Sequence, residues 1–291
     1  MTISVATRIE QALMAAVAEA SAPGCPPRLA EALRYSVFPG GARVRPRLCL
    51  AVAASCGDDA PGLADAAAAA IELLHCASLV HDDLPCFDDS PLRRGKPTVH
   101  KAFGERLAVL VGDAMIVMAF QTLARHAAEV PHRLAPLLLT VGGAVGMPLG
   151  IAAGQAWECE PRLVLSEYHK SKTGALFVAA CAAGAQAAGA DPAPWRPVGL
   201  RLGEAYQVAD DLRDAMCNLD ELGKPVHRDA ELGRPSAVAA LGIAGAVARL
   251  RELVAEAVIA VPDCPGASQL KALIAAESTR ILPRELASAA A

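Results

Sequence analysis

The chain has 291 residues and a formal net charge of -4, from 27 lysines and arginines against 31 aspartates and glutamates. This negative balance argues against broad nucleic-acid binding, which needs an excess of basic residues. Hydrophobic residues make up 54% of the chain and aromatics only 3%, so Ala, Leu and Val must form the interior. Nine cysteines without a C-x-x-C pair, and an N-terminus without a basic region followed by an apolar block, predict a reduced, cytoplasmic protein.

Helix-length segments separated by prolines and glycines make up most of the chain. Ala and Leu favour helices, and no run alternates apolar and polar residues with the β-branched content that a strand needs. No long low-complexity linker divides the sequence. We therefore predict a single all-α domain over residues 1–291. The expected helices, in chain order, cover residues 4–20, 28–36, 44–56, 62–84, 106–128, 133–146, 166–189, 196–217, 236–259 and 266–281.

The segment Gly40–Pro46 leads into the third expected helix and carries two arginines, Arg43 and Arg45. Free N–H groups at a helix start favour anions, and a guanidinium matches phosphate oxygens. Each arginine can equally be an ordinary cation whose stem covers apolar surface.

The helix expected at 62–84 ends in an acidic cluster, Asp82, Asp83 and Asp88. Asp82 and Asp88 are six residues apart and would not share a face of a straight helix. Pro85 should end the helix, so that the chain curls and Asp88 returns toward Asp82 and Asp83. Such carboxylates bind hard cations through oxygen, although a solvated acidic helix end is the simpler interpretation of one cluster alone.

Basic residues lie on both sides of this cluster. Arg93 and Arg94 follow it directly, in a position to meet phosphate. His75 lies seven residues before Asp82, about two turns away on the same face. A lone histidine on an apolar helix is more often a satisfied core residue, and its place beside the cluster is what makes it a candidate.

Two uncharged stretches, Ala135–Trp157 and Thr173–Ala190, are long enough to cross a membrane. Both are rich in Gly and Ala, which drive insertion weakly, and the first contains Pro148. We expect buried helices and no membrane span. Lys172-Thr173-Gly174 interrupts the second apolar helix and is a further candidate for phosphate binding.

The second acidic cluster contains Asp210, Asp211 and Asp214. Asp210 and Asp214 are spaced i, i+4, so their like charges repel on one helix face unless a cation lies between them. Neither cluster has the alternating loop of an EF-hand. A shared site would require the two helices to face each other across a bundle.

Together these motifs resemble the trans-isoprenyl diphosphate synthases, most closely the bacterial geranylgeranyl diphosphate synthases of carotenoid and bacteriochlorophyll pathways. The resemblance runs from Gly40 to beyond Lys224, and only the combination of motifs is specific. It implies a bundle of ten or more mostly antiparallel helices around a central cavity (the isoprenoid synthase fold), usually as a homodimer. The motifs that carry it are His75, Asp82-Asp83-x4-Asp88, Arg93-Arg94-Gly95-Lys96-Pro97-Thr98, Lys172-Thr173-Gly174 and Gln207-x-x-Asp210-Asp211-x-x-Asp214.

The resemblance also implies a role for each matching residue. The Mg²⁺ ligands would be Asp82, Asp88 and Asp210. Support for that cluster, as ligands or through water, would come from Asp83, Asp211 and Asp214. The allylic diphosphate would be held by Arg93, Lys172 and Lys224. The diphosphate of isopentenyl diphosphate would be held by Arg45, His75 and Arg94. Thr173 and Gln207 would line the reacting centre.

The implied reaction is a head-to-tail condensation with three Mg²⁺ per active site. The allylic substrate (dimethylallyl, geranyl or farnesyl diphosphate) ionises, the double bond of isopentenyl diphosphate attacks, and a proton is lost. In this family the residue five before the first aspartate can form a floor under the growing chain. Here it is Ala77, followed by Ser78, so an open floor favours a twenty-carbon product.

One departure from the family pattern affects the first basic motif. The usual Gly-Gly-Lys-Arg is replaced by a sequence with Ala42 in the lysine position. Either the binding of isopentenyl diphosphate is weaker, or Arg43 compensates. A synthase of another chain length, such as farnesyl diphosphate synthase, and a non-catalytic subunit of a heteromeric synthase remain alternatives. A class I terpene cyclase is disfavoured because its second metal motif is normally built from Asn, Ser and Glu.

Overall fold

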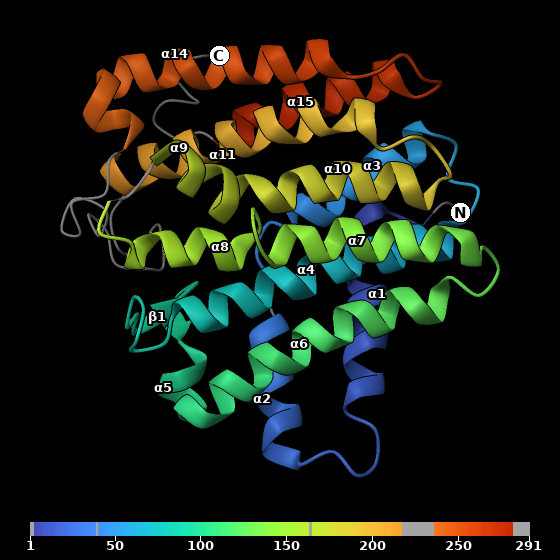
Figure 1. The fold of residues 1–291 in the computed structure, drawn as a ribbon, viewed down its shortest axis with the longest axis vertical. Coiled ribbons are helices and arrows are strands. Elements are labelled where there is room, and N and C mark those ends of the chain that lie inside the picture. The colour runs from blue at the N-terminus through green and yellow to red at the C-terminus, as the bar shows by residue number, and fades with distance from the viewer. Residues whose placement is uncertain (1–2, 39, 163–164, 217–235, 282–291) are drawn as a thin grey trace. The chain divides into compact units, whose positions relative to one another are not determined.

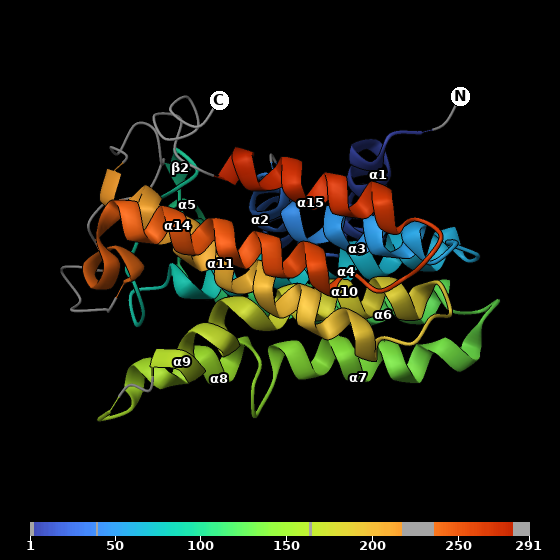
Figure 2. The same cartoon turned by 90° about the horizontal axis from the view of Figure 1, so that it is seen from above.

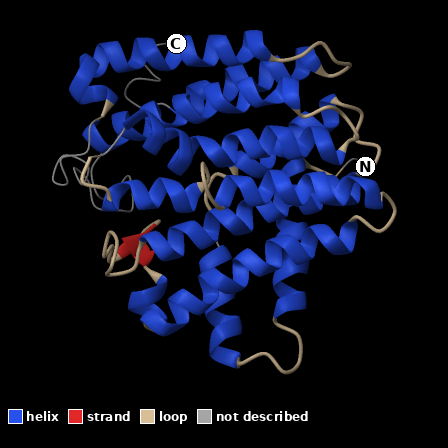
Figure 3. Ribbon diagram, viewed as in Figure 1, coloured by secondary structure: helices blue, strands red, loops and turns tan. Residues whose placement is uncertain are grey.

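The computed structural model describes residues 3–38, 40–162, 165–216 and 236–281, and these are mostly helical (Figures 1 and 3). The chain forms two compact units. The first comprises Met1–Val141 with Ala183–Ala190, and the second comprises Gly142–Ala182 with Asp191–Ala291. The all-α class is confirmed, and the single-domain organisation stays a prediction.

The first unit contains the N-terminal helices. Two helices, α7 and α10, contribute residues to both units. The N-terminal elements are α1 (Val5–Ala20), α2 (Pro27–Val37), α3 (Val44–Ser55), α4 (Pro61–Asp82), α5 (Val99–Phe103), α6 (Glu105–His126), the 3-10 turn η1 (Pro131–Arg133) and α7 (Leu134–Val145).

Helix α4 is the core of the first unit. Pro61 occupies its first turn, where a missing N–H costs nothing. The alanines of Ala66–Ala70 are at most 2% exposed, because side chains this small let α3 and α6 pack closely against α4 (Figure 1). The helix ends at Asp82, shortly before Pro85. A helix buried on nearly all sides is therefore what presents the first acidic cluster.

A two-stranded hairpin, which the sequence did not predict, follows that cluster (Figure 3). Strands β1 (Leu92–Arg93) and β2 (Lys96–Pro97) pair antiparallel. The two residues between them, Arg94 and Gly95, have φ of 55° and 74°, which matches the two-residue turn favoured in hairpins. Strands of two residues are too short to show an alternating pattern.

The second unit holds the later helices. These are α8 (Ile151–Ala156), the 3-10 turn η2 (Trp157–Cys159), α9 (Leu165–His169), the π-helical turn η3 (Lys170–Gly174), α10 (Ala175–Ala187), the 3-10 turn η4 (Ala193–Trp195), α11 (Arg196–Met216), α14 (Ala237–Ala260) and α15 (Ala267–Ile281). Helices α11 and α14 lie side by side (Figure 2). Ser236 caps α14 by accepting the N–H of Ala239.

The predicted helix ends agree with the structure to within about two residues, the usual spread for helix termini. Two helices, α5 and α8, were not predicted. The first of the two uncharged stretches, Ala135–Trp157, is divided between α7 and α8 and is not one continuous helix. Of the described residues, α4 and α6 are long and apolar enough to cross a membrane, although 78% of the most apolar stretch of α4 is buried. Burial of that kind is typical of a core helix.

Candidate active site

The first acidic cluster closes on itself at the end of α4, as predicted. The backbone N–H of Asp88 donates to the carbonyl of Asp82 at 3.0 Å, and that of Asp89 donates to Leu84 at 3.1 Å. Pro85 lies in this turn, where the helix has already stopped. The curl brings the backbone of Asp88 back to that of Asp82, and both residues are expected to bind metal.

Asp83 has a different environment from its neighbours. It is 3% exposed, and Nε and Nη2 of Arg93 lie 3.1 and 2.5 Å from its Oδ1. Burial raises the pKa of Asp83, the Arg93 guanidinium opposes this, and Asp82 and Asp88 add to the rise. Asp83 is thus a support that fixes Arg93 at the edge of the cluster.

Arg94 extends from the hairpin turn toward the loop before α3. A Cβ on Gly41 would lie 2.8 Å from Cζ of Arg94, so the guanidinium rests directly on the Gly41 backbone. The absence of a side chain at position 41 leaves the space that the Arg94 guanidinium occupies. Two basic motifs, about fifty residues apart in the sequence, therefore meet in the first unit.

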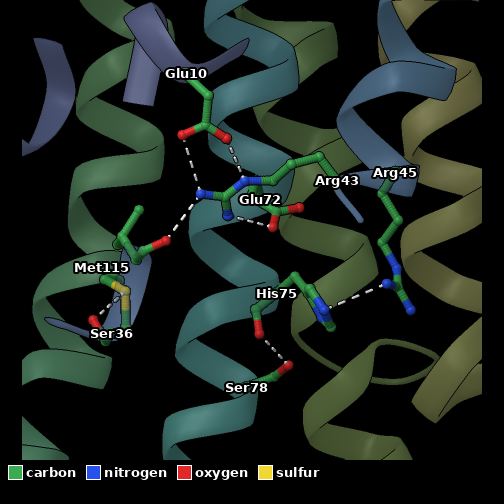
Figure 4. Close-up of polar contacts among 9 residues, drawn as sticks. Glu10, Ser36, Arg43, Arg45, Glu72, His75, Ser78 and Met115 are labelled. Carbon is green, nitrogen blue, oxygen red and sulfur yellow. Dashed lines mark hydrogen bonds and ion pairs between the residues drawn. The ribbon is translucent and has the colours of Figure 1, made fainter. Parts of the chain in front are cut away.

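His75 lies among these cations on α4. Its Nε2 is 3.5 Å from Nη1 of Arg45 (Figure 4). Burial lowers the pKa of His75 well below its ordinary value, and the charges of Arg45, Arg94, Arg93 and Arg43 lower it further. A neutral imidazole in a field of guanidinium groups is a favourable place for a multiply charged anion. The structure thus brings together Arg45, His75 and Arg94, the three residues expected at one diphosphate.

Arg43 does not replace the missing lysine at Ala42. Its guanidinium is bound by Glu10 and Glu72 (Figure 4), and it also donates to the carbonyl of Val37. Ala42 is exposed. Of the two alternatives, the structure favours the loss of one cation from this site.

The two chain-length candidates lie on α4 next to His75. Ala77 is 1% exposed, and Ser78 is half-buried, with its hydroxyl donating to the carbonyl of His75 at 2.8 Å. Ala77 is thus a small, tightly enclosed position one turn above the acidic cluster.

In the second unit, Lys172, Thr173 and Gly174 form part of the π-helical turn η3. Single π turns inside helices are rare, and those that occur are often found at functional sites. The predicted interruption is therefore confirmed as a local change of helix type. Helix α11 approaches this turn closely, because a Cβ on Gly203 would lie 2.8 Å from the Cα of Gly174.

A chain of hydrogen bonds joins this turn to the second acidic cluster. Thr173 Oγ1 donates to Gln207 Oε1 at 2.7 Å, and Gln207 Nε2 donates to Asp211 Oδ1 at 2.9 Å. Asp211 also accepts the backbone N–H of Ala237, the first residue of α14, at 2.7 Å. With 4% exposure, Asp211 is a structural anchor for Gln207.

Asp210 and Asp214 are half-buried on α11. Nη2 of Arg213 lies 3.3 Å from Oδ1 of Asp210. The cluster thus divides into an anchored residue, Asp211, and two more accessible carboxylates one turn apart, which agrees with the metal-ligand role predicted for Asp210.

Lys172 has a partner that the sequence analysis missed. Its Nζ lies 2.6 Å from Oε1 of Glu158, which also accepts the hydroxyl of Tyr168 at 2.7 Å. Glu158 places a negative charge where the ammonium group of Lys172 would meet a diphosphate. An available signal was Gln155 and Glu158, polar residues one turn apart at the end of an apolar stretch.

Comparison with known proteins agrees with this arrangement. A family model described as polyprenyl synthetase matches residues 26–267. A geranylgeranyl diphosphate synthase of Cereibacter sphaeroides is 53% identical, covering 97% of this chain and 98% of its relative. Another from Rhodobacter capsulatus is 48% identical, covering 96% and 97%.

The chain belongs to the polyprenyl synthetase family.

The fold agrees with this membership. The crystal structure of a Helicobacter pylori geranyltransferase complexed with magnesium and isoprenyl diphosphate matches with a TM-score of 0.78 and 27% identity, covering 96% of this chain and 99% of the other. This likeness identifies the isoprenoid synthase fold.

The aspartates of this polyprenyl synthetase fit Mg²⁺ shared with a substrate. Among the residues that the structure describes, no three His, Cys, Asp or Glu side chains form a group that could hold a metal by themselves. Mg²⁺ usually binds one or two carboxylates together with phosphate oxygens and water. The donor set, hard carboxylate oxygens beside guanidinium groups, therefore suits a metal bridged to a diphosphate. Lys224, the remaining candidate, lies outside the described residues.

Proposed function

We propose that the chain is a geranylgeranyl diphosphate synthase, a prenyltransferase that condenses isopentenyl diphosphate with an allylic diphosphate. The observation that carries this proposal is the cluster in the first unit, where Arg45 and the charge of Arg94 meet neutral His75 on α4, the helix that ends in the first aspartate motif. Near-full-length identity of 53% with a geranylgeranyl diphosphate synthase supports the product.

In this reaction the residues of the first unit bind diphosphate groups and Mg²⁺. Arg45, His75 and Arg94 hold the diphosphate of isopentenyl diphosphate, with His75 as a neutral hydrogen-bond donor. The proposed ligands of the three Mg²⁺ are Asp82 and Asp88 in the first unit and Asp210 in the second. When bound, the metal supplies positive charge to the departing diphosphate of the allylic substrate. Arg93 and Lys172, each kept in place by an acidic partner, are the cations proposed to bind the allylic diphosphate.

The second unit orients the reacting centre. Thr173 and Gln207 are fixed by the hydrogen bonds that run to Asp211, so their polar atoms are ordered before substrate binds. The double bond of isopentenyl diphosphate attacks the allylic cation, and a proton leaves the adjacent carbon. The released diphosphate is the base we propose for that proton, since it lies at the site where the charge develops.

The product length follows from Ala77 and Ser78. A small side chain at the floor position leaves room for a growing hydrocarbon, so we propose twenty carbons. Cytoplasmic localisation is proposed because the described cysteines are free, which suits a reducing compartment.

A homodimer is also proposed, and one face of α6 supports it. Val109, Leu110 and Val117 are 41%, 52% and 54% exposed, and Leu110 and Val117 are spaced i, i+7 on that face. Exposed apolar side chains gathered on one helix face are typical of an interaction surface.

The metal-bridge mechanism is tested by Asp82→Ala and Asp210→Ala. Each should lower kcat at least about a hundredfold, the scale for loss of one group that stabilises developing charge, while circular dichroism and melting temperature stay near those of the parent protein. Asp59→Ala is the matched control. Asp59 is an exposed aspartate that pairs with Arg133 and has no proposed part in the reaction. Near-normal turnover in either site variant would contradict the mechanism.

A further inference from the structure

Arg43 lies at the entrance to α3, enclosed by carboxylates (Figure 4). Its Nε is 2.9 Å from Oε1 of Glu10, its Nη1 is 2.7 Å from Oε1 of Glu72, and its Nη2 donates to the carbonyl of Val37 at 2.9 Å. Arg43 is 7% exposed and Glu72 is 2% exposed. A guanidinium bound at this many points cannot turn toward a ligand. Any influence of Arg43 on the site must pass through the elements that it holds together.

Arg43 keeps its charge in spite of its burial. Burial by itself lowers the pKa of Arg43, but the hydrogen bond of Glu10 and the charge and hydrogen bond of Glu72 raise it above its ordinary value. Removing one carboxylate would therefore leave a buried cation with less compensation, the situation that costs most in a protein interior.

The backbone at Arg43 depends on these contacts. Its φ of 51° and ψ of 39° are left-handed, a conformation that persists in a non-glycine residue when its surroundings enforce it. A Cβ on Gly40 would lie 2.0 Å from Cζ of Arg43, so glycine at position 40 leaves the space that the guanidinium fills. The ion pairs thus fix the turn through which the chain enters α3.

Two contacts then join the start of α3 to the same face of α4. Glu72 and His75 are one turn apart on α4, and they meet Arg43 and Arg45 respectively (Figure 4). The Arg43–Glu72 distance is 2.7 Å, whereas the Arg45–His75 distance is 3.5 Å. The first contact is a charge-assisted hydrogen bond, and the second is at the limit of hydrogen bonding. The Arg43–Glu72 hydrogen bond is therefore the stronger of the two contacts, and it can fix the position from which Arg45 meets His75.

We propose that Glu72, acting through Arg43, is a positioning residue for the site that binds the diphosphate of isopentenyl diphosphate, the homoallylic site. The buried pair sets the start of α3 against α4 and so places Arg45 beside His75. Neither Glu72 nor Arg43 touches the substrate. The inference rests on the proposed function in one respect, namely that Arg45 and His75 meet the diphosphate of isopentenyl diphosphate.

The test is steady-state kinetics of Glu72→Gln, which keeps the side-chain size and removes the charge. The KM for isopentenyl diphosphate should rise about tenfold, as is typical when a partner that orients a binding group is lost. The kcat and the KM for the allylic substrate should stay within about twofold, because the displaced groups serve only one diphosphate. Arg43→Lys loses the guanidinium group but keeps a positive charge. It should also raise the KM for isopentenyl diphosphate alone, and it replaces Glu72→Gln as the test if that variant folds poorly.

Arg8→Gln is the matched control. Arg8 also bridges two carboxylates in the first unit, Asp58 and Asp65, without contact to α3's entrance. It should lower the melting temperature and leave both KM values unchanged. An unchanged KM for isopentenyl diphosphate in Glu72→Gln and Arg43→Lys would overturn the inference, as would equal rises in both KM values. Absence of any product from the parent protein would instead contradict the proposed function.

Discussion

At the scale of single residues, binding of diphosphate depends on which cations of the site are paired with acidic side chains and on how many cations the site has. Arg43, Arg93 and Lys172 each have an acidic partner, whereas Ala42 brings no cation to a position where the family usually has lysine. The homoallylic site thus has fewer positive groups than the family pattern implies.

Ala42→Lys should therefore improve the enzyme. Ala42 is exposed beside Gly41, on which the Arg94 guanidinium rests, so a new ammonium group could reach the same diphosphate. A hydrogen bond between charged groups contributes about 1.5 kcal/mol or more, which should lower the KM for isopentenyl diphosphate by about tenfold or more. Initial rates at saturating allylic substrate measure this effect. An unchanged KM would mean that another residue already fills the role.

His75 should make stability depend on pH. Its pKa is lowered in the folded chain by burial and by neighbouring arginines, whereas in the unfolded chain it protonates near pH 6.5. As the pH falls below about 6.5, the unfolded state binds a proton that the folded state does not, so stability decreases. His75→Asn should remove this part of the slope.

Melting temperatures between about pH 7 and pH 5 check this prediction, with His132→Asn, a change at an exposed histidine, as the control. Equal slopes in His75→Asn and the parent protein would show that His75 does not stay neutral.

The resemblance predicted Asp83 and Asp211 as supporting residues of their clusters, but the partners that hold them could not be predicted at this scale. Their partners, Arg93 and the backbone of Ala237, are ten and twenty-six residues further along the chain. Sequence spacing on one helix carries no information about such contacts. Glu158 was missed for the same reason, since Lys172 and Tyr168 reach it from another segment.

At the scale of helices, the prolines were the most reliable guide to where a helix begins and ends. Pro61 begins α4, and Pro85 follows its end. Helix α8 was missed because six residues are too few to show a helical period, and α5 is shorter still. The hairpin was missed because its strands have two residues each, although Arg94-Gly95 contained the glycine that such a turn favours.

Ala77→Phe tests the role of α4 as the floor. A ring at this enclosed position should shorten the main product to fifteen carbons or fewer. It should also cost about 1–3 kcal/mol in stability through overpacking. Chromatography of the dephosphorylated products gives the length, and thermal melting gives the cost.

Ala68→Phe is the matched control for the floor. Ala68 is also fully buried on α4, nine residues earlier and on the opposite face at about 100° per residue. It should be destabilised similarly while the product length stays the same. An unchanged product in Ala77→Phe would place the floor at other residues.

At the scale of the whole molecule, the exposed apolar face of α6 is the proposed dimer interface. This helix passes the length and hydropathy criteria of a membrane span, but only 44% of its most apolar stretch is buried. Its exposed apolar face suits contact with a second copy, since homodimer interfaces are more apolar than the rest of a protein surface.

Leu110→Glu and Val117→Glu should each shift the protein from dimer to monomer, because they place a charge in the middle of that face. Light scattering after size-exclusion chromatography measures the mass. Leu139→Glu, at a 78% exposed position of α7, should leave the mass unchanged. A monomeric parent protein, or a dimer that survives both α6 substitutions, would contradict the assignment of the interface.

The central claim is that this chain alone makes geranylgeranyl diphosphate. The most direct test is incubation of the purified protein with Mg²⁺, labelled isopentenyl diphosphate and, separately, each allylic diphosphate, followed by chromatography of the dephosphorylated products. We expect a dominant twenty-carbon alcohol that disappears when EDTA removes the metal. A dominant product of another length would contradict the role of Ala77, and no product from any allylic substrate would contradict the proposed function and favour a subunit of a heteromeric synthase.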